Sequence, residues 1–184
     1  MSAELFLVAP ADAEAAPFAG QLQRVLDAEP AAALFLPRGA RDEDAYRAFV
    51  EAVLPIAQSR DCAVLVDGDA ALAKRLGADG VHVSSGLSAV KDALAALKPD
   101  MIVGAGDLHS RHDAMQKAEA GVDYVFFGDL EAGQALPEDI DNAIWWAETF
   151  EIPCVLFEAG RDAAGTGAEF VALGPSLFGM EAAR

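Results

Sequence analysis

Gly77-Ala78-Asp79-Gly80-Val81 recurs as Gly121-Val122-Asp123-Tyr124-Val125 and again as Gly167-Ala168-Glu169-Phe170-Val171. The copies are offset by 44 and 46 residues, which is the length of two consecutive βα units. In each copy we expect the glycine to end a helix in a left-handed turn, the acid to cap that turn, and a buried strand to follow. The repeat therefore predicts strands at three regularly spaced places in the chain.

Eight short apolar runs alternate with helical patterns from one end of the chain to the other. Several runs are continuously apolar, which is typical of strands buried on both faces of a parallel sheet. The expected strands are Leu5–Ala9, Ala32–Leu36, Ala63–Val66, Gly80–Val83, Met101–Ala105, Tyr124–Phe127, Cys154–Phe157 and Phe170–Leu173. Eight strands in this alternation, with the repeat before the fourth, sixth and eighth, favour a closed (βα)8 TIM barrel over an open sheet.

Apolar residues at helical spacing lie between most of these strands. The faces that they form are Phe18-Leu22-Val25-Leu26, Tyr46-Phe49-Val50-Val53-Leu54, Val90-Ala93-Leu94-Leu97 and Ile140-Ile144-Ala147, and Ser110 is placed to cap the helix that runs through Ala118. Between the seventh strand and the last repeat, Arg161–Ala164 has room for one turn at most. The seventh helix is therefore predicted to be largely deleted, and residues 1–184 are expected to form a single domain.

The chain is strongly acidic, with a formal net charge of −17 at pH 7. Such a surface repels phosphate backbones and anionic lipid, so we expect neither nucleic-acid nor membrane partners. Cys62 and Cys154 each open an apolar run and are predicted to be buried thiols rather than a disulfide or metal pair. Residues 1–10 lack the features of a signal peptide, and no apolar run is long enough to span a membrane, which predicts a cytoplasmic protein.

Four segments resemble those of thiamine-phosphate synthases, in the same order along nearly the whole chain. They are the opening Leu5–Val8, Leu76-Gly77-Ala78-Asp79-Gly80-Val81-His82, Gly104–Ser110 and Asp123-Tyr124-Val125-Phe126-Phe127-Gly128. The related thiazole tautomerases share this scaffold and are not separated by these segments. The resemblance implies a barrel of thiamine biosynthesis that joins an aminopyrimidine diphosphate to a thiazole phosphate and releases diphosphate. Such a site needs cations or Mg²⁺ to stabilise the leaving diphosphate, and carboxylates to hold the metal.

Several positions depart from the pattern of that family. Where the family carries Q-x-R-x-K after the second strand, only Arg38 keeps a positive charge. The N-D-R after the third strand is replaced by Asp67-Gly68-Asp69, so that Asp67 or Asp69 would have to hold the metal. The loop after the sixth strand contains Glu131 and has lost its lysine, and the glycine pair after the seventh is reduced to Ala159-Gly160, preceded by Glu158.

The candidate site residues follow from the resemblance, because active sites of these barrels lie at the carboxyl ends of the strands. Arg38, His109 and Asp129 are the candidate catalytic residues, and Asp129 stands where the tautomerases carry a histidine. Asp67 and Asp69 are the candidate metal ligands, with a turn and a helix cap as the structural alternative. His82 and Ser84 are candidate pocket residues, although a structural histidine and a simple turn would fit the same letters.

Gly160, Gly174 and Ser176 are the candidate phosphate-binding residues. Leu173-Gly174-Pro175-Ser176 resembles the phosphate-holding turn after the eighth strand, where backbone N–H groups bind an anion without a basic side chain.

Three functions follow as hypotheses. The first is a thiamine-phosphate synthase or a close variant that uses Mg²⁺, with activity expected to be weak or lost. The second is a silent barrel that binds a phosphoester such as a thiazole phosphate. The third is a barrel used for protein contact, with a mouth plugged by Leu34, Leu36 and Leu87. Trp145-Trp146, on the sixth helix, suggests a homodimer contact.

Overall fold

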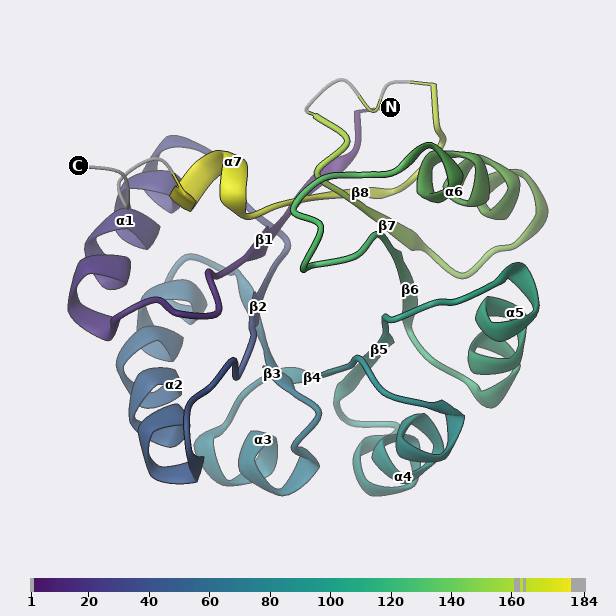
Figure 1. Cartoon of the computed structure of the whole chain (residues 1–184). Helices are drawn as coiled ribbons and strands as arrows, with labels where there is room; N and C mark the ends of the chain where they lie inside the picture. Colours follow the sequence, from purple (N-terminus) through teal and green to yellow (C-terminus); the bar gives the residue numbers. More distant parts are fainter. Residues whose placement is uncertain (1, 161–162, 164, 180–184) are drawn as a thin grey trace.

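The computed structural model describes residues 2–160, 163 and 165–179. Its eight strands are all parallel and close into a ring in sequence order, with β1 beside β8 (Figure 1). The strands are β1 (Glu4–Val8), β2 (Ala33–Leu36), β3 (Ala63–Asp67), β4 (Gly80–Val83), β5 (Ile102–Ala105), β6 (Tyr124–Phe127), β7 (Cys154–Phe157) and β8 (Phe170–Leu173). The closed (βα)8 barrel predicted from the sequence is confirmed, and each strand lies within one residue of its predicted bounds.

In the described part of the chain, helices surround the ring on all sides except between β7 and β8 (Figure 1). They are α1 (Ala15–Ala28), α2 (Glu43–Gln58), α3 (Ala70–Leu76), α4 (Leu87–Leu97), α5 (Arg111–Ala120), α6 (Pro137–Thr149) and the short α7 (Pro175–Phe178), which follows β8. The described residues between β7 and β8 contain no helix, as predicted, while Arg161, Asp162 and Ala164 lie outside the described part of the chain.

The strands are apolar on both faces because each face packs into a different core. Inside the ring, aromatic side chains fill the barrel: Phe6, Phe35, Tyr124, Phe126 and Phe157. Alternate residues of the same strands point outward to the helices. Leu34 and Leu36 belong to this outer core, so the prediction that they plug the mouth is wrong. Leu87 begins α4 instead of filling the mouth.

The acid of the repeat has a different role from the predicted turn cap. Asp79 Oδ2 accepts the N–H of Val64 at 2.7 Å. The equivalent acids, Asp123 and Glu169, accept the N–H groups of Val103 at 2.8 Å and Cys154 at 2.9 Å. Each acid therefore satisfies a backbone donor near the start of the preceding strand and ties two neighbouring strands together at the amino end of the barrel.

The ends of α3 and α5 follow the sequence prediction. Gly77 and Gly121 end these helices with φ of 72° and 110°, in the left-handed region that favours glycine. Ser110 caps α5, because its Oγ accepts the N–H of Asp113 at 3.1 Å.

The buried face of α6 differs from the predicted one. Ala143 and Trp146 are buried, whereas Ile140, Ile144 and Ala147 are only partly so. Trp146 packs on Phe127 of β6, and its indole N–H donates to Ile152 O at 2.8 Å. This tryptophan therefore belongs to the core of the subunit, and a homodimer stays a prediction.

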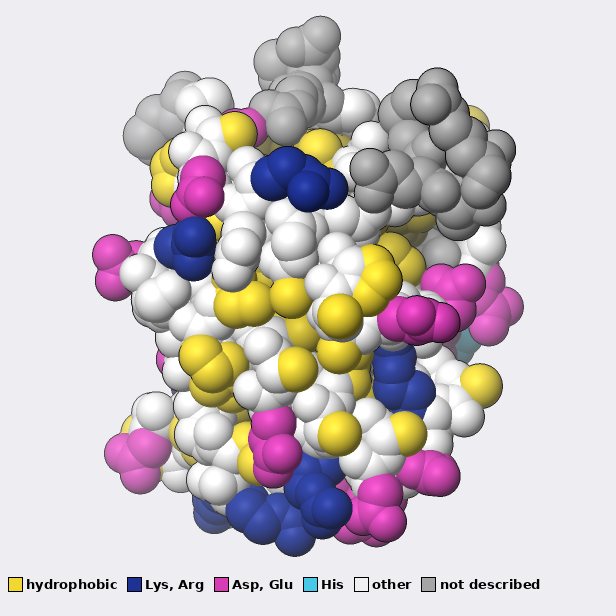
Figure 2. Space-filling view, turned by 90° about the vertical axis from the view of Figure 1, so that its left-hand side faces the viewer, with side chains coloured by type: hydrophobic (Ala, Val, Ile, Leu, Met, Phe, Trp, Pro, Cys, Tyr) yellow, Lys and Arg dark blue, Asp and Glu magenta, His cyan; other side chains and the backbone are white. Residues whose placement is uncertain are grey.

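The outer surface of the described residues exposes few large hydrophobic side chains. Figure 2 shows the side that carries α1 and α2, where apolar side chains are interspersed with acidic and basic ones. Leu136 is the one large hydrophobic side chain that is exposed in the described part of the chain. Cys62 and Cys154 are buried free thiols, as predicted, and burial raises the pKa of each to about 12. Among the described helices, none combines the length and the apolar character needed to cross a membrane.

Candidate functional site

Two cavities lie at the carboxyl end of the barrel, where the loops that follow the strands meet. The first, of about 370 Å³, is lined by His82, Ser84, Asp107, Phe126, Gly128, Asp129, Leu130 and Glu131. The second, of about 390 Å³, is mainly apolar and is lined by Val8, Ala9, Pro10, Ala11, Pro37, Gly39, Leu130, Glu131, Phe157, Pro175 and Gly179. Leu130 and Glu131 border both, so we call the two cavities together the mouth. Among the described residues, no lysine or arginine lines the mouth, whereas three carboxylates do.

His82 lies in the wall of the first cavity and is 1% exposed. Its Nδ1 lies 2.7 Å from Tyr124 Oη, and its ring packs on Phe35, with ring centroids 4.4 Å apart. Burial, with a smaller contribution from the charge of Lys117, lowers the pKa of His82 to about 3. The imidazole is therefore neutral near pH 7 and can donate or accept one hydrogen bond at each nitrogen, but it cannot neutralise a phosphate.

Gly106 allows the His82 ring to occupy this position. A Cβ at Gly106 would lie 2.5 Å from His82 Nε2, which is closer than real contacts allow. Ser84, the other candidate pocket residue, is exposed at the rim of the same cavity. The structure thus brings His82 and Ser84 to one cavity, as the sequence analysis expected, and adds Asp107 and Phe126 to them.

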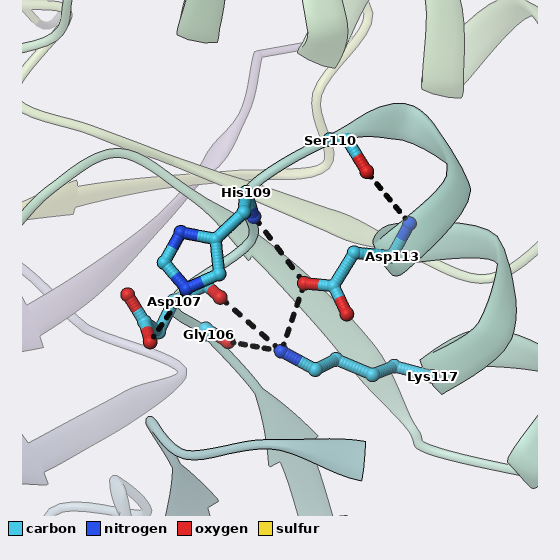
Figure 3. Close-up of polar contacts among 6 residues, drawn as sticks. All are labelled: Gly106, Asp107, His109, Ser110, Asp113 and Lys117. Atoms are coloured by element: carbon cyan, nitrogen blue, oxygen red, sulfur yellow. Dashed lines mark hydrogen bonds and ion pairs between the residues drawn. The ribbon is translucent and has the colours of Figure 1, made fainter.

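Lys117 of α5 is 1% exposed and was not singled out in the sequence. Figure 3 shows its ammonium group facing the segment that follows β5. Nζ donates to the carbonyl oxygens of Gly106 and Asp107, each at 3.2 Å, and to Asp113 Oδ2 at 3.1 Å. The spacing of Asp113 and Lys117 is visible in the sequence, but such an i,i+4 pair is ordinarily exposed on a helix. Lys117 therefore holds the loop of residues 106–110 in place through the carbonyl oxygens of Gly106 and Asp107.

His109 lies outside the lining of the mouth. Its side chain is 77% exposed, and its Nε2 lies 3.2 Å from Asp107 Oδ2 (Figure 3). Its backbone N–H donates to Asp113 Oδ2 at 3.2 Å. Asp107, which the sequence analysis did not select, is the residue of this loop that reaches the first cavity. It adopts φ of +51°, which is uncommon for a residue other than glycine.

Arg38 and Asp67 lie in adjacent loops and contact each other through the backbone of Arg38. The N–H of Arg38 donates to Asp67 Oδ2 at 2.9 Å, while the guanidinium Nε donates to Arg41 O at 3.1 Å. The Asp67 N–H donates to Tyr46 Oη at 2.8 Å. Burial raises the pKa of the Asp67 carboxyl, against the opposing effects of Arg38. The guanidinium of Arg38 thus supports its own loop and does not line the mouth.

Asp69, the second candidate metal ligand, caps α3. Its Oδ1 accepts the N–H of Leu72 at 2.8 Å, which is the structural alternative considered for this motif. In the described part of the chain, no group of three or more His, Cys, Asp or Glu side chains could hold a metal ion. Asp67 and Asp69 each accept a backbone N–H and belong to no such group, so the described residues do not form a ligand set that fits the Mg²⁺ implied by the resemblance.

The side chain of Glu158, which follows β7, contacts the turn after β8. Glu158 Oε1 accepts the N–H of Gly174 at 2.7 Å, the N–H of Ser176 at 3.1 Å and the hydroxyl of Ser176 at 3.0 Å. Gly160, the third candidate phosphate-binding residue, is exposed with φ of +78°. Asp129 lines the first cavity from its rim, and its Oδ1 accepts the N–H of Glu131 at 2.8 Å. Of the donors expected to bind phosphate, those of Gly174 and Ser176 therefore already bind a carboxylate.

Known proteins share both the sequence and the architecture of this chain. The family model described as thiamine monophosphate synthase matches residues 5–176. The chain is 36% identical to a thiamine-phosphate synthase of Rhodospirillum centenum (strain ATCC 51521 / SW), over 92% of this chain and 86% of the relative. It is 34% identical to a thiamine-phosphate synthase of Erythrobacter litoralis (strain HTCC2594), over 86% of this chain and 84% of the relative.

A solved structure supports the fold. The thiamine phosphate pyrophosphorylase from Pyrococcus furiosus superposes with a TM-score of 0.78 at 19% identity, covering 97% of this chain and 88% of that one. The resemblance seen in four segments of the sequence thus extends over the whole barrel. The chain belongs to the thiamine monophosphate synthase family, a family of thiamine biosynthesis.

Proposed function

We propose that this chain does not join the aminopyrimidine diphosphate to the thiazole phosphate. We propose that its mouth instead binds the unphosphorylated form of one of these two ring compounds. The joining reaction separates diphosphate from a pyrimidine, so its site must stabilise a group that carries several negative charges. The observation that carries the proposal is the charge of the mouth. Asp107, Asp129 and Glu131 line it, and no described lysine or arginine does.

The two expected sources of positive charge, Arg38 and a bound metal ion, also support this proposal. The Nε–H of Arg38 donates to a loop carbonyl, and the expected metal ligands, Asp67 and Asp69, each accept a backbone N–H. A carboxylate rim without a metal raises the free energy of a bound diphosphate by like-charge repulsion. The same rim is compatible with a neutral or cationic ligand.

The walls of the mouth favour a planar ring. Phe126 lies in the wall of the first cavity, with its ring centroid 5.1 Å from that of His82, and Phe157 lines the apolar second cavity. The neutral imidazole of His82 can form one directional hydrogen bond with a ring nitrogen or a hydroxyl group. Aromatic side chains with a few polar groups beside them are the ordinary composition of a site for a small heteroaromatic molecule.

Activity and binding are tested separately on the purified protein. With the aminopyrimidine diphosphate, the thiazole phosphate and Mg²⁺, we expect no diphosphate release above a blank without protein, while a family synthase measured in parallel turns over. Isothermal titration calorimetry with the thiazole alcohol and with the aminopyrimidine alcohol should show saturable binding of at least one of them, weakened at least about tenfold by Phe126→Ala. Turnover comparable with that of the synthase would overturn the proposal, and so would the absence of binding of both alcohols.

A further inference from the structure

Three hydrogen-bond donors converge on one oxygen atom after β8. They are the backbone N–H groups of Gly174 and Ser176 and the hydroxyl of Ser176, and the atom is Glu158 Oε1, at 2.7, 3.1 and 3.0 Å. Glu158 directly follows β7, and β7 pairs with β8, so the side chain reaches across to the neighbouring loop. Several neutral donors directed at one anionic oxygen are the arrangement by which protein turns bind phosphate.

The backbone holds Glu158 in place. Its N–H donates to Ala172 O at 2.8 Å, and its carbonyl accepts the N–H of Ala135 at 3.4 Å. Its φ of +50° lies in the left-handed region, which residues other than glycine rarely adopt. Bonds on both sides of the residue therefore keep the carboxylate directed at the turn.

The position of the turn is also fixed. A Cβ at Gly174 would lie 2.8 Å from Val8 O, so this backbone packs tightly against β1. The donors of the turn therefore keep their direction when the carboxylate is removed.

We propose that Glu158 determines ligand choice in this barrel: its carboxylate is an internal anion that occupies the Gly174–Ser176 turn and excludes phosphate from it. A phosphate in the turn would have to replace Glu158 Oε1 at the same donors and would also be repelled by the displaced carboxylate. This inference deepens the proposed function and rests on it for the claim that the preferred ring ligand is unphosphorylated.

The test is a pair of substitutions, Glu158→Gly and Glu158→Ala. Both substitutions remove the carboxylate. Glycine readily adopts the positive φ of residue 158, whereas alanine has the same reluctance to adopt it as glutamate and so controls for added backbone freedom. We expect both variants to bind inorganic phosphate at least about tenfold more tightly than the wild type in calorimetric titrations, because the repulsion and the competing acceptor are gone. In ¹⁵N spectra, addition of phosphate should shift the amide resonances of Gly174 and Ser176 in the variants and leave them unchanged in the wild type.

Two controls make the result specific. Glu138→Gln removes the same charge from an exposed residue on the first turn of α6, whose side chain forms no hydrogen bond or ion pair with another described residue, and should not increase phosphate affinity. Adding Ser176→Ala to Glu158→Gly should reduce the gained affinity, since one of the three donors is lost.

Folded variants with wild-type affinity for phosphate would overturn the inference, as would a wild type that already shifts the Gly174 amide with phosphate. The ring alcohols, titrated into the same variants, separate the two proposals. If the wild type binds neither alcohol but Glu158→Gly gains phosphate affinity, the proposed function fails while the role of Glu158 in excluding phosphate stands.

Discussion

Lowering the pH should destabilise this protein through His82. The side chain is 1% exposed, lies against Phe35 and Phe126, and contacts Tyr124 Oη through Nδ1 at 2.7 Å. Burial lowers its pKa from 6.5 to about 3, and the positive charge of Lys117 contributes in the same direction. The folded protein thus keeps this imidazole neutral at pH values where the unfolded chain protonates it.

The size of the effect follows from proton linkage. Below pH 6.5 the unfolded state binds a proton that the folded state does not, so the free energy of unfolding falls with pH until the folded-state pKa is reached. Each pH unit in this window costs about 1.4 kcal/mol. With folded and unfolded pKa values of about 3 and 6.5, His82 alone removes about 2 kcal/mol between pH 7.5 and pH 5.

The assay compares urea unfolding of the wild type and His82→Gln at pH 7.5, 6.5, 5.5 and 5.0. The variant has lost the titrating group but keeps a polar side chain near Tyr124, so other ionisable groups contribute equally to both curves. We expect the difference in unfolding free energy between the two proteins to shift by about 2 kcal/mol in favour of the variant as the pH falls. Parallel curves over this range would refute the buried, neutral state of His82.

Two further substitutions test contacts that tie the barrel together, each measured by urea unfolding. Lys117→Met should lower the unfolding free energy by about 2–4 kcal/mol, because two carbonyl oxygens and a carboxylate lose their buried donor, whereas the exposed Lys74→Met should change it by about 0.5 kcal/mol or less. Asp123→Ala should cost about 1–3 kcal/mol, since the N–H of Val103 and the ammonium group of Lys98 lose their acceptor, and the exposed Asp100→Ala serves as its control. A substitution that costs no more than its control would contradict the corresponding role.

The fold could be predicted closely because its signals are local. Each strand is a short apolar run, and α1, α2 and α4 have their buried apolar residues on one face. The glycine at the end of a helix is recognisable because few other residues adopt that backbone conformation, as Gly77 and Gly121 show. On α6, the face that includes Trp146 is buried instead of the predicted one, because both faces of this helix carry apolar residues and contact with β6 and β7 decides between them.

The candidate site could be predicted only in part. The sequence located His82, Ser84 and Asp129 at the carboxyl ends of their strands, and the structure brings all three to one cavity. It also suggested His109, where Asp107 reaches the cavity instead. Asp107 and His109 are two residues apart in this loop, and their side chains point in different directions. Those directions depend on the backbone conformation of the loop.

By itself, the sequence determined the alternation of eight strands and their helices, the family, and the loss of positive residues from the strand ends, because each of these follows from short motifs and from their order along the chain. Only the tertiary structure decided which groups from different segments share one space. Lys117 is buried beneath the loop of residues 106–110, and Glu158 meets the donors of Gly174 and Ser176. Both contacts exist because packing of α5 on the loop before it, and pairing of β7 with β8, bring together groups that are 10 to 18 residues apart in the chain.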